Sequence, residues 1–330
     1  SDEFNFTEKL KTIVGVRVEK YDLFFTGQNN QGTIKYNDEK TIDKLDFFPS
    51  TNIIYSLTDN TNLRLSYSLS TARPSFKESS ISQIYDPISG LTYNGNLNLK
   101  PSYINNFDFR FENYGNGNQM FAISGFYKTF QDPIELTFFS GSAPTNTQHR
   151  NIGEAKVYGA EFEFRKDLDF IGLNNFNFNI NASLIESIQQ MDKTPNGEYD
   201  TKIASTRTGE TIKDTRQLQG QSPYLINGTL SYVNEKFDFD ANLSYNVQGE
   251  TLEVVGIAAI PDVYTLPFHS LGFNMSKKLG EEKNSTIRFA ITNILNDERE
   301  SVYKAFNSNN EIFSRKIPFQ SFSLSYSYKF

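Results

Sequence analysis

The sequence predicts an all-β fold, an antiparallel transmembrane β-barrel, from three observations. Residues 321–330 alternate strictly, with aromatic or leucine side chains on one face and serine or lysine on the other. This period-2 pattern is typical of a strand between an apolar and a polar surface. The aromatic content of 15%, combined with a mean hydropathy of −0.51, fits alternating strands whose polar half lowers the average. Finally, long and short connections alternate along the whole chain.

The alternation marks about twelve strands. In the first, Val14, Val16 and Val18 share one parity, and in the fourth, Phe107 and Phe109 alternate with charged residues. The predicted segments are 11–25, 45–57, 63–70, 107–112, 121–127, 158–165, 176–184, 224–232, 237–247, 271–275, 287–292 and 321–330.

Long and short connections between the predicted strands alternate along the chain. The long ones are 26–44, 71–102, 131–150, 186–218, 249–264 and 296–317, and the short ones are 58–61, 114–118, 167–174, 233–236 and 277–285. Outer-membrane barrels have short periplasmic turns and long extracellular loops, whereas a soluble β-sandwich, the competing interpretation, has no reason for this sorting. We therefore expect the C-terminus on the periplasmic side.

Within the strands, charged residues and aromatic residues occupy alternate positions, so the two kinds lie on opposite faces. An Arg or Lys facing lipid near the bilayer midplane costs about 2–4 kcal/mol, and an Asp or Glu costs less. The charged parity is therefore expected to face a wet lumen. Its candidate lumen residues are Asp108, Arg110, Glu112, Glu161, Glu163 and Arg165.

Composition excludes several classes of protein. The absence of Cys excludes disulfides, thiolate zinc sites and iron–sulfur clusters. A net charge of −7 argues against nucleic-acid binding. No apolar run approaches the roughly 18 residues of a spanning helix, and residues 1–9 lack the basic and apolar regions of a signal peptide. The chain is therefore expected to be mature, truncated or a piece of a longer protein.

An ordered set of motifs lies between residues 71 and 135. It comprises Ala72-Arg73-Pro74-Ser75-Phe76-Lys77-Glu78, Gly95-Asn96-Leu97-Asn98-Leu99-Lys100-Pro101, Phe126-Tyr127-Lys128 and Asp132-Pro133-Ile134-Glu135. This set resembles the C-terminal half of the barrel of a TonB-dependent outer-membrane receptor of the Bacteroidota type. The resemblance implies an N-terminal plug and a 22-stranded barrel with a plugged lumen, so the plug and about ten strands are expected upstream. Residues 1–330 are then the C-terminal part of one barrel domain, with residues 1–9 in a periplasmic turn.

The resemblance implies an active-uptake receptor that imports a nutrient with TonB-supplied energy and has no enzymatic activity and no cofactor. Its implied partners are the TonB complex through the plug, outer-membrane lipids, the barrel-assembly machinery and, as an open option, a surface lipoprotein. The assembly signal corresponds to Tyr326, Tyr328 and Phe330 in the terminal strand. The alternative is a complete smaller barrel that acts as a passive channel or a hydrolase. The ligand stays open among iron chelates, glycans, peptides and vitamins.

Ligand-contact candidates lie in or beside the long loops. They are Arg73, Glu78, Asn96, His149 and Arg150. Arg73 has an alternative role as an ion-pair partner of Glu78 or of a plug residue. His149 and His269 are the residues a hydrolase would need, but no nucleophile elbow accompanies them. The sequence predicts no metal site, although the acidic loop group at Asp38, Glu39 and Asp43 leaves calcium open.

Overall fold

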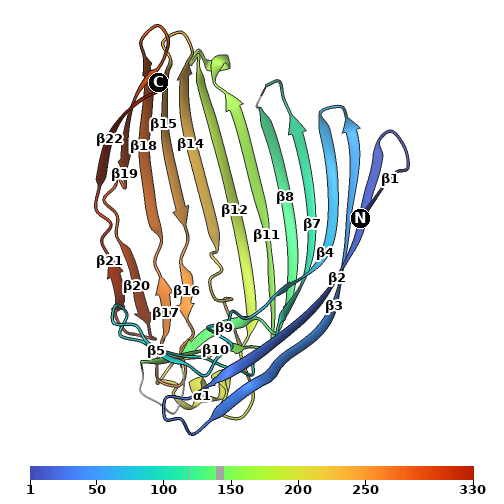
Figure 1. Ribbon diagram of the computed structural model, residues 1–330, viewed down its shortest axis with the longest axis vertical. Coiled ribbons are helices and arrows are strands. Elements are labelled where there is room, and N and C mark those ends of the chain that lie inside the picture. Colours follow the sequence, from blue (N-terminus) through green and yellow to red (C-terminus); the bar gives the residue numbers. More distant parts are fainter. Residues whose placement is uncertain (118, 139–144) are drawn as a thin grey trace.

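The alternating segments form one large antiparallel sheet, which curves through the computed structural model (Figure 1). The structure describes residues 1–117, 119–138 and 145–330. Residue 118 of the predicted 114–118 turn and residues 139–144 of the predicted 131–150 loop lie outside the described residues.

The 14-stranded sheet follows the chain in order, each strand antiparallel to the next. Its strands are β1 (Asp2–Asn5), β2 (Leu10–Gln28), β3 (Lys35–Thr58), β4 (Thr61–Ala72), β7 (Ser102–Tyr114), β8 (Met120–Gln131), β11 (Glu154–Asp167), β12 (Phe176–Gln190), β14 (Tyr224–Asn234), β15 (Phe239–Gln248), β18 (Phe268–Leu279), β19 (Ser285–Thr292) and β22 (Ser321–Tyr328), with β13 (Thr215–Arg216) beside β12. The predicted strands are confirmed, and β1 and β22 are the edges of an open sheet.

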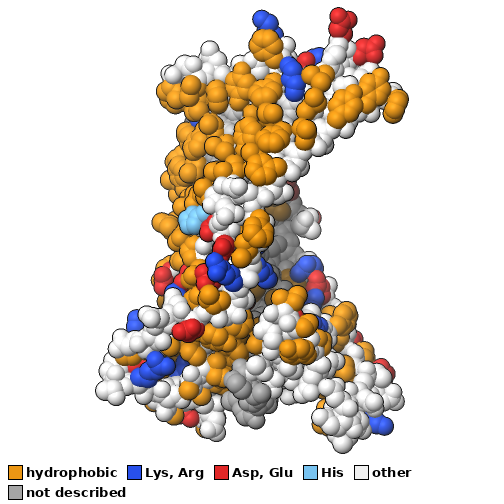
Figure 2. Space-filling view, turned by 90° about the vertical axis from the view of Figure 1, so that its left-hand side faces the viewer, with side chains coloured by type: hydrophobic (Ala, Val, Ile, Leu, Met, Phe, Trp, Pro, Cys, Tyr) orange, Lys and Arg blue, Asp and Glu red, His pale blue; other side chains and the backbone are white. Residues whose placement is uncertain are grey.

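The two faces of the sheet differ as the alternation predicts. Apolar side chains pair across one face, as Tyr67 and Phe107 do with ring centroids 4.9 Å apart. Many of them are exposed, and hydrophobic side chains cover much of the strand region in Figure 2. The opposite face carries ion pairs such as Arg64 with Glu112. An exposed apolar face and an ion-paired face match the outward and inward faces of a transmembrane β-barrel.

The prediction of a loop over residues 26–44 is wrong, because β2 and β3 continue as a two-stranded ribbon to Gln28 and Lys35. The ribbon extends beyond the pairing of β3 with β4, which begins at Ser50. Pro49 lies at that point. It has no N–H to donate, and β4 does not pair with β3 there, so the proline interrupts no hydrogen bond between these two strands. Because the ribbon has few buried residues, its strands lack the apolar alternation that sequence analysis requires.

The other long connections gather at one end of the sheet, the loop end, and most of them are folded (Figure 1). One small sheet contains β5 (Gln83–Tyr85), β6 (Thr92–Asn94), β10 (Asn146–Asn151) and β9 (Ile134–Phe138). A second contains β16 (Thr251–Val254), β17 (Asp262–Thr265), β20 (Arg299–Lys304) and β21 (Glu311–Lys316). These four connections, which were expected to be loops, therefore contain strands.

The two small sheets share a core. The amide of Phe138 donates to the carbonyl of Val255 at 2.9 Å, and the amide of Val255 donates to the carbonyl of Leu136 at 3.0 Å. Phe138, Val254, Ile257 and Val263 form a buried cluster beneath this junction. The core therefore fixes loops that are far apart in the sequence against one another.

Other short elements complete the fold. The helix α1 (Glu198–Ala204) lies at the loop end, and a 3-10 turn, Asp169–Ile171, lies in the predicted 167–174 turn. Two predictions about the termini need correction: residues 1–9 contain β1 before their turn, and β22 ends at Tyr328 rather than at the last residue. Among the described residues, no helix has the length and apolarity to cross a membrane.

Candidate functional site

Three predicted ligand-contact residues, distant in the sequence, meet at the loop end. The carboxylate of Glu78 lies 3.5 Å from Nε2 of His149. The amide of Asn96 binds both residues: its backbone N–H donates to the carbonyl of Glu78 at 2.7 Å, and its Nδ2 donates to the carbonyl of His149 at 3.0 Å. These hydrogen bonds join the 71–102 connection to β10.

The surroundings of His149 adjust its protonation. Nδ1 of His149 lies 3.2 Å from the hydroxyl of Tyr93, and the ammonium of Lys77 lies 4.4 Å from the centroid of that tyrosine ring. Burial lowers the pKa of His149 below its usual 6.5, and the neighbouring Lys77 acts in the same direction while Glu78 opposes it. Burial also raises the pKa of Tyr93, so its hydroxyl stays protonated. His149 is therefore a neutral hydrogen-bonding group at neutral pH.

The two predicted arginines lie elsewhere. Nη2 of Arg73 donates to Glu19 of β2 at 2.5 Å, and its guanidinium lies 4.5 Å from the ring centroid of Tyr21. The suggested pair of Arg73 with Glu78 is thus replaced by a contact with the β2–β3 ribbon. Nε of Arg150 donates to Gln148 at 3.3 Å, and burial lowers the pKa of this arginine.

A buried ion cluster that the sequence analysis missed lies beneath the loops. Arg216 is 4% exposed and donates to both oxygens of Glu135 at 2.7 and 3.0 Å and to both oxygens of Glu198 at 2.7 and 3.0 Å. Lys202 extends the cluster from Glu198, at 3.1 Å, to Asp262, at 2.9 Å. The cluster joins β9, α1, β13 and β17. The Asp-Pro-Ile-Glu motif contained Glu135, but no local pattern pointed to the other members.

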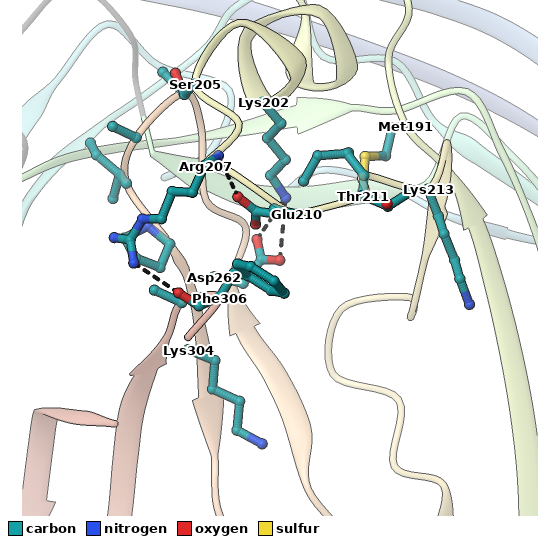
Figure 3. A pocket seen from close by; sticks show the side chains of 16 residues that line it. Met191, Lys202, Ser205, Arg207, Glu210, Thr211, Lys213, Asp262, Lys304 and Phe306 are labelled. Atoms are coloured by element: carbon teal, nitrogen blue, oxygen red, sulfur yellow. Dashed lines mark hydrogen bonds and ion pairs between the residues drawn. The ribbon is translucent and has the colours of Figure 1, made fainter. Parts of the chain in front are cut away.

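A cavity of about 220 Å³, the loop pocket, adjoins this cluster. It is lined by residues of three connections: Met191, Lys202, Ser205, Arg207 and residues 210–213 from the first, residues 258–262 from the second, and residues 304–306 from the third. Figure 3 shows Arg207 of the 186–218 connection reaching toward the 296–317 connection, where its Nη1 donates to the carbonyl of Phe306 at 2.9 Å. Its backbone N–H donates to Glu210 at 2.9 Å. With the side chains of Met191 and Phe306 among paired charges, the pocket can bind a small ligand that has both apolar and polar groups.

The predicted lumen residues come together on the polar face of β7 and β11. Arg110 donates to Glu112 and Glu163, each at 3.0 Å, and Arg165 lies 3.8 Å from Glu163. Arg64 of β4, which the sequence analysis did not select, binds Glu112 at 2.6 Å. The register places Asp108 beside Ser66 and Glu161 beside Ser124 on the same face. The result is a chain of alternating charges across neighbouring strands.

The remaining sequence candidates are also accounted for. His269 shares a hydrogen bond with the hydroxyl of Tyr245 at 2.7 Å, and within the described part of the chain neither histidine ring forms a hydrogen bond with a serine hydroxyl. Asp43 is paired with Lys20 and Lys40. Tyr326, Tyr328 and Phe330 are exposed at the β22 edge. Among the residues described, no group of His, Asp and Glu has the spacing of a metal site.

Comparison with known proteins gives a consistent result. The family model described as "TonB dependent receptor-like, beta-barrel" matches residues 1–294. The copper transporter OprC has a similar fold, with a TM-score of 0.68 and 16% identity over 99% of this chain and 48% of that one. The siderophore receptor PirA from Acinetobacter baumannii has a TM-score of 0.60 and 14% identity over 99% of this chain and 44% of its own.

A mutant form of the ferric enterobactin receptor PfeA from Pseudomonas aeruginosa has a TM-score of 0.59 and 14% identity, over 99% of this chain and 44% of that chain. A search of curated proteins found no match. The chain therefore spans about half the length of the solved structures that it resembles, and at these identities the likeness concerns the fold.

Proposed function

The chain belongs to the TonB dependent receptor-like β-barrel family, and on this premise we propose that it forms part of an outer-membrane active-uptake receptor. In this proposal residues 1–330 are the C-terminal part of a 22-stranded barrel, and a plug domain and further strands belong to the same protein. The open edges of the sheet at β1 and β22 support this arrangement, because each edge presents unpaired backbone groups that a closed barrel would pair.

One observation carries the proposal: the sheet has short turns at one end and folded, mutually fixed connections at the other (Figure 1). This asymmetry matches a barrel with periplasmic turns and extracellular loops. The C-terminus lies at the short-turn end in Figure 1 and would be periplasmic. The nutrient would then bind at the loop end, in the loop pocket and near Glu78, Asn96 and His149.

The polar face suits the wall of a plugged lumen. Arg110, Glu163 and their neighbours form the charge chain described above, and ions of this kind are costly against lipid. We propose that this face meets the plug, and that the TonB complex pulls on the plug from the periplasm to admit the nutrient. Tyr326, Tyr328 and Phe330 would be read by the barrel-assembly machinery during insertion.

Proteins of similar fold include a copper transporter and siderophore receptors, so chelated metals are the first ligands to test. The motifs between residues 71 and 135 favour a receptor from the Bacteroidota, in which a surface lipoprotein is a further candidate partner.

Two measurements on the full-length protein test the proposal without knowledge of the ligand. In planar bilayers we expect no steady conductance, because a plug fills the lumen, whereas a passive channel would conduct. In a pull-down from detergent we expect the periplasmic domain of TonB to retain the full-length protein but not a variant that lacks the plug. Steady conductance by the unmodified protein, or equal retention of both forms, would refute the uptake mechanism.

A further inference from the structure

The apolar face of the sheet has a shallow pit between β7, β8 and β11. The register places Phe109 beside Gly125, and Gly125 beside Ala160, so two small residues lie side by side on this face. A depression with a volume of about 400 Å³ lies over Gly125. We call it the aromatic pit, and its principal lining residues are Leu65, Phe107, Phe109, Gly125, Tyr127 and Tyr158.

The rim of the pit is aromatic on its loop-end side. Phe107, Tyr127 and Tyr158 follow one another across β7, β8 and β11 in a single row of the register. The side chains of Tyr127 and Tyr158 are 40% and 41% exposed, and Leu65 and Phe109 are about half exposed. Nothing in the described part of the chain covers this apolar surface, which would be unfavourable in water.

The position of the pit across the membrane follows from its neighbours. The next row of this face toward the loop end consists of Asn105, Thr129 and the exposed Lys156 on the same three strands. In the row of Tyr158 itself, the neighbouring residue on β12 is Glu186. The change from apolar to polar residues marks the membrane–water boundary, where tyrosines concentrate in barrels. The pit therefore extends from the loop-end boundary toward the hydrocarbon.

We propose that the aromatic pit is a binding site for one lipid of the leaflet nearest the loops. An acyl chain lies on the floor at Gly125, and the acyl ester or amide oxygens lie at the hydroxyls of Tyr127 and Tyr158. The concave surface gives a chain more atoms within van der Waals distance than the flat face beside it does. Each tyrosine hydroxyl, at the membrane–water boundary, gains a hydrogen-bond acceptor from the lipid.

A larger side chain substituted at Gly125 would fill the pit without distorting the strand. A Cβ at this position would meet only the carbonyl oxygen of Gly159, at 3.9 Å, which is an ordinary contact. Gly228 provides a matched control on the same face, because the register places it between Ile180 and Tyr245 and a Cβ there meets no atom within 4 Å. Gly228 does not line the pit.

The experiment compares lipids retained by the full-length receptor after extraction from native outer membrane with a mild detergent. Native mass spectrometry would count the lipid adducts on the wild type, on Gly125→Leu and on Gly228→Leu. Fold is checked for each variant by heat-dependent migration in gels. We expect one tightly held lipid on the wild type, a loss of at least fivefold in Gly125→Leu, and retention close to the wild type in Gly228→Leu.

A second variant tests the role of the hydroxyls. The double substitution Tyr127→Phe and Tyr158→Phe keeps the aromatic rim and should lower lipid retention to between the wild-type and Gly125→Leu values. Equal retention in the wild type and Gly125→Leu would overturn the site, as would an equal loss in Gly125→Leu and Gly228→Leu. These outcomes are independent of conductance and of TonB binding, so the site can fail while the uptake proposal stands.

Discussion

Replacing Arg216 with Met should release the loop-end connections from one another. Arg216 is 4% exposed, and the two carboxylates that it neutralises, on Glu135 and Glu198, are 1% and 6% exposed. Removing one partner of a buried ion pair typically costs about 3–5 kcal/mol, because the remaining charge is uncompensated. Here two buried carboxylates would lose their shared cation, leaving Lys202 beside Glu198 and the backbone N–H of Gln219 beside Glu135.

Hydrogen–deuterium exchange of the full-length protein in detergent measures this cost directly. A loss of about 3–5 kcal/mol corresponds to roughly a hundred-fold to a few-thousand-fold faster exchange in β9, α1 and β13, if these elements open as one unit. The membrane-spanning strands β7 and β8 should exchange as in the wild type. The effect is therefore expected to be confined to the loop end.

Two further variants distinguish charge from general damage. Lys193→Met removes an ion pair with Asp214 in the same connection, but both side chains are more than half exposed, so exchange should not change. The triple variant Arg216→Met, Glu135→Gln and Glu198→Gln removes the charges together and should regain much of the protection. If Arg216→Met exchanges as slowly as the wild type, the ion cluster does not hold the loops.

Three other predictions concern the small sheets at the loop end. The pKa of His149 is lowered by burial, so below about pH 6.5 the opened state binds more protons than the closed one, and closure becomes less stable as pH falls. At pH 5.5, hydrogen–deuterium exchange in β10 should therefore be faster than the pH dependence of the intrinsic amide exchange rate explains. The substitution His149→Gln should abolish this additional exchange. Gly95→Ala should destabilise the 71–102 connection, because its Cβ would lie 2.4 Å from the carbonyl oxygen of Ser80; unchanged exchange in β6 would contradict this. Phe138→Ala should cost about 3–5 kcal/mol of local stability, because the ring is fully buried in the shared core; limited proteolysis of β16 and β17 would reveal it.

Alternation along the sequence predicted the membrane-spanning part of the fold almost completely. The long strands of the large sheet, from β4 to β22, lie where the period-2 pattern placed them. The charged positions of β7 and β11 lie together on one ion-paired face. This success has a local cause: a strand with one apolar and one polar environment must alternate at every residue, whatever its partners are.

The tertiary structure alone decided the arrangement at the loop end. The β2–β3 ribbon, the two small sheets and the cluster around Arg216 depend on contacts between segments that are distant in the sequence. Such segments are short or exposed on both sides, so no periodicity marks them as strands. The contact between Glu78 and His149 also depends on tertiary structure. Both residues were selected from the sequence, but the pairing of β6 with β10 and the hydrogen bonds of Asn96 bring them together.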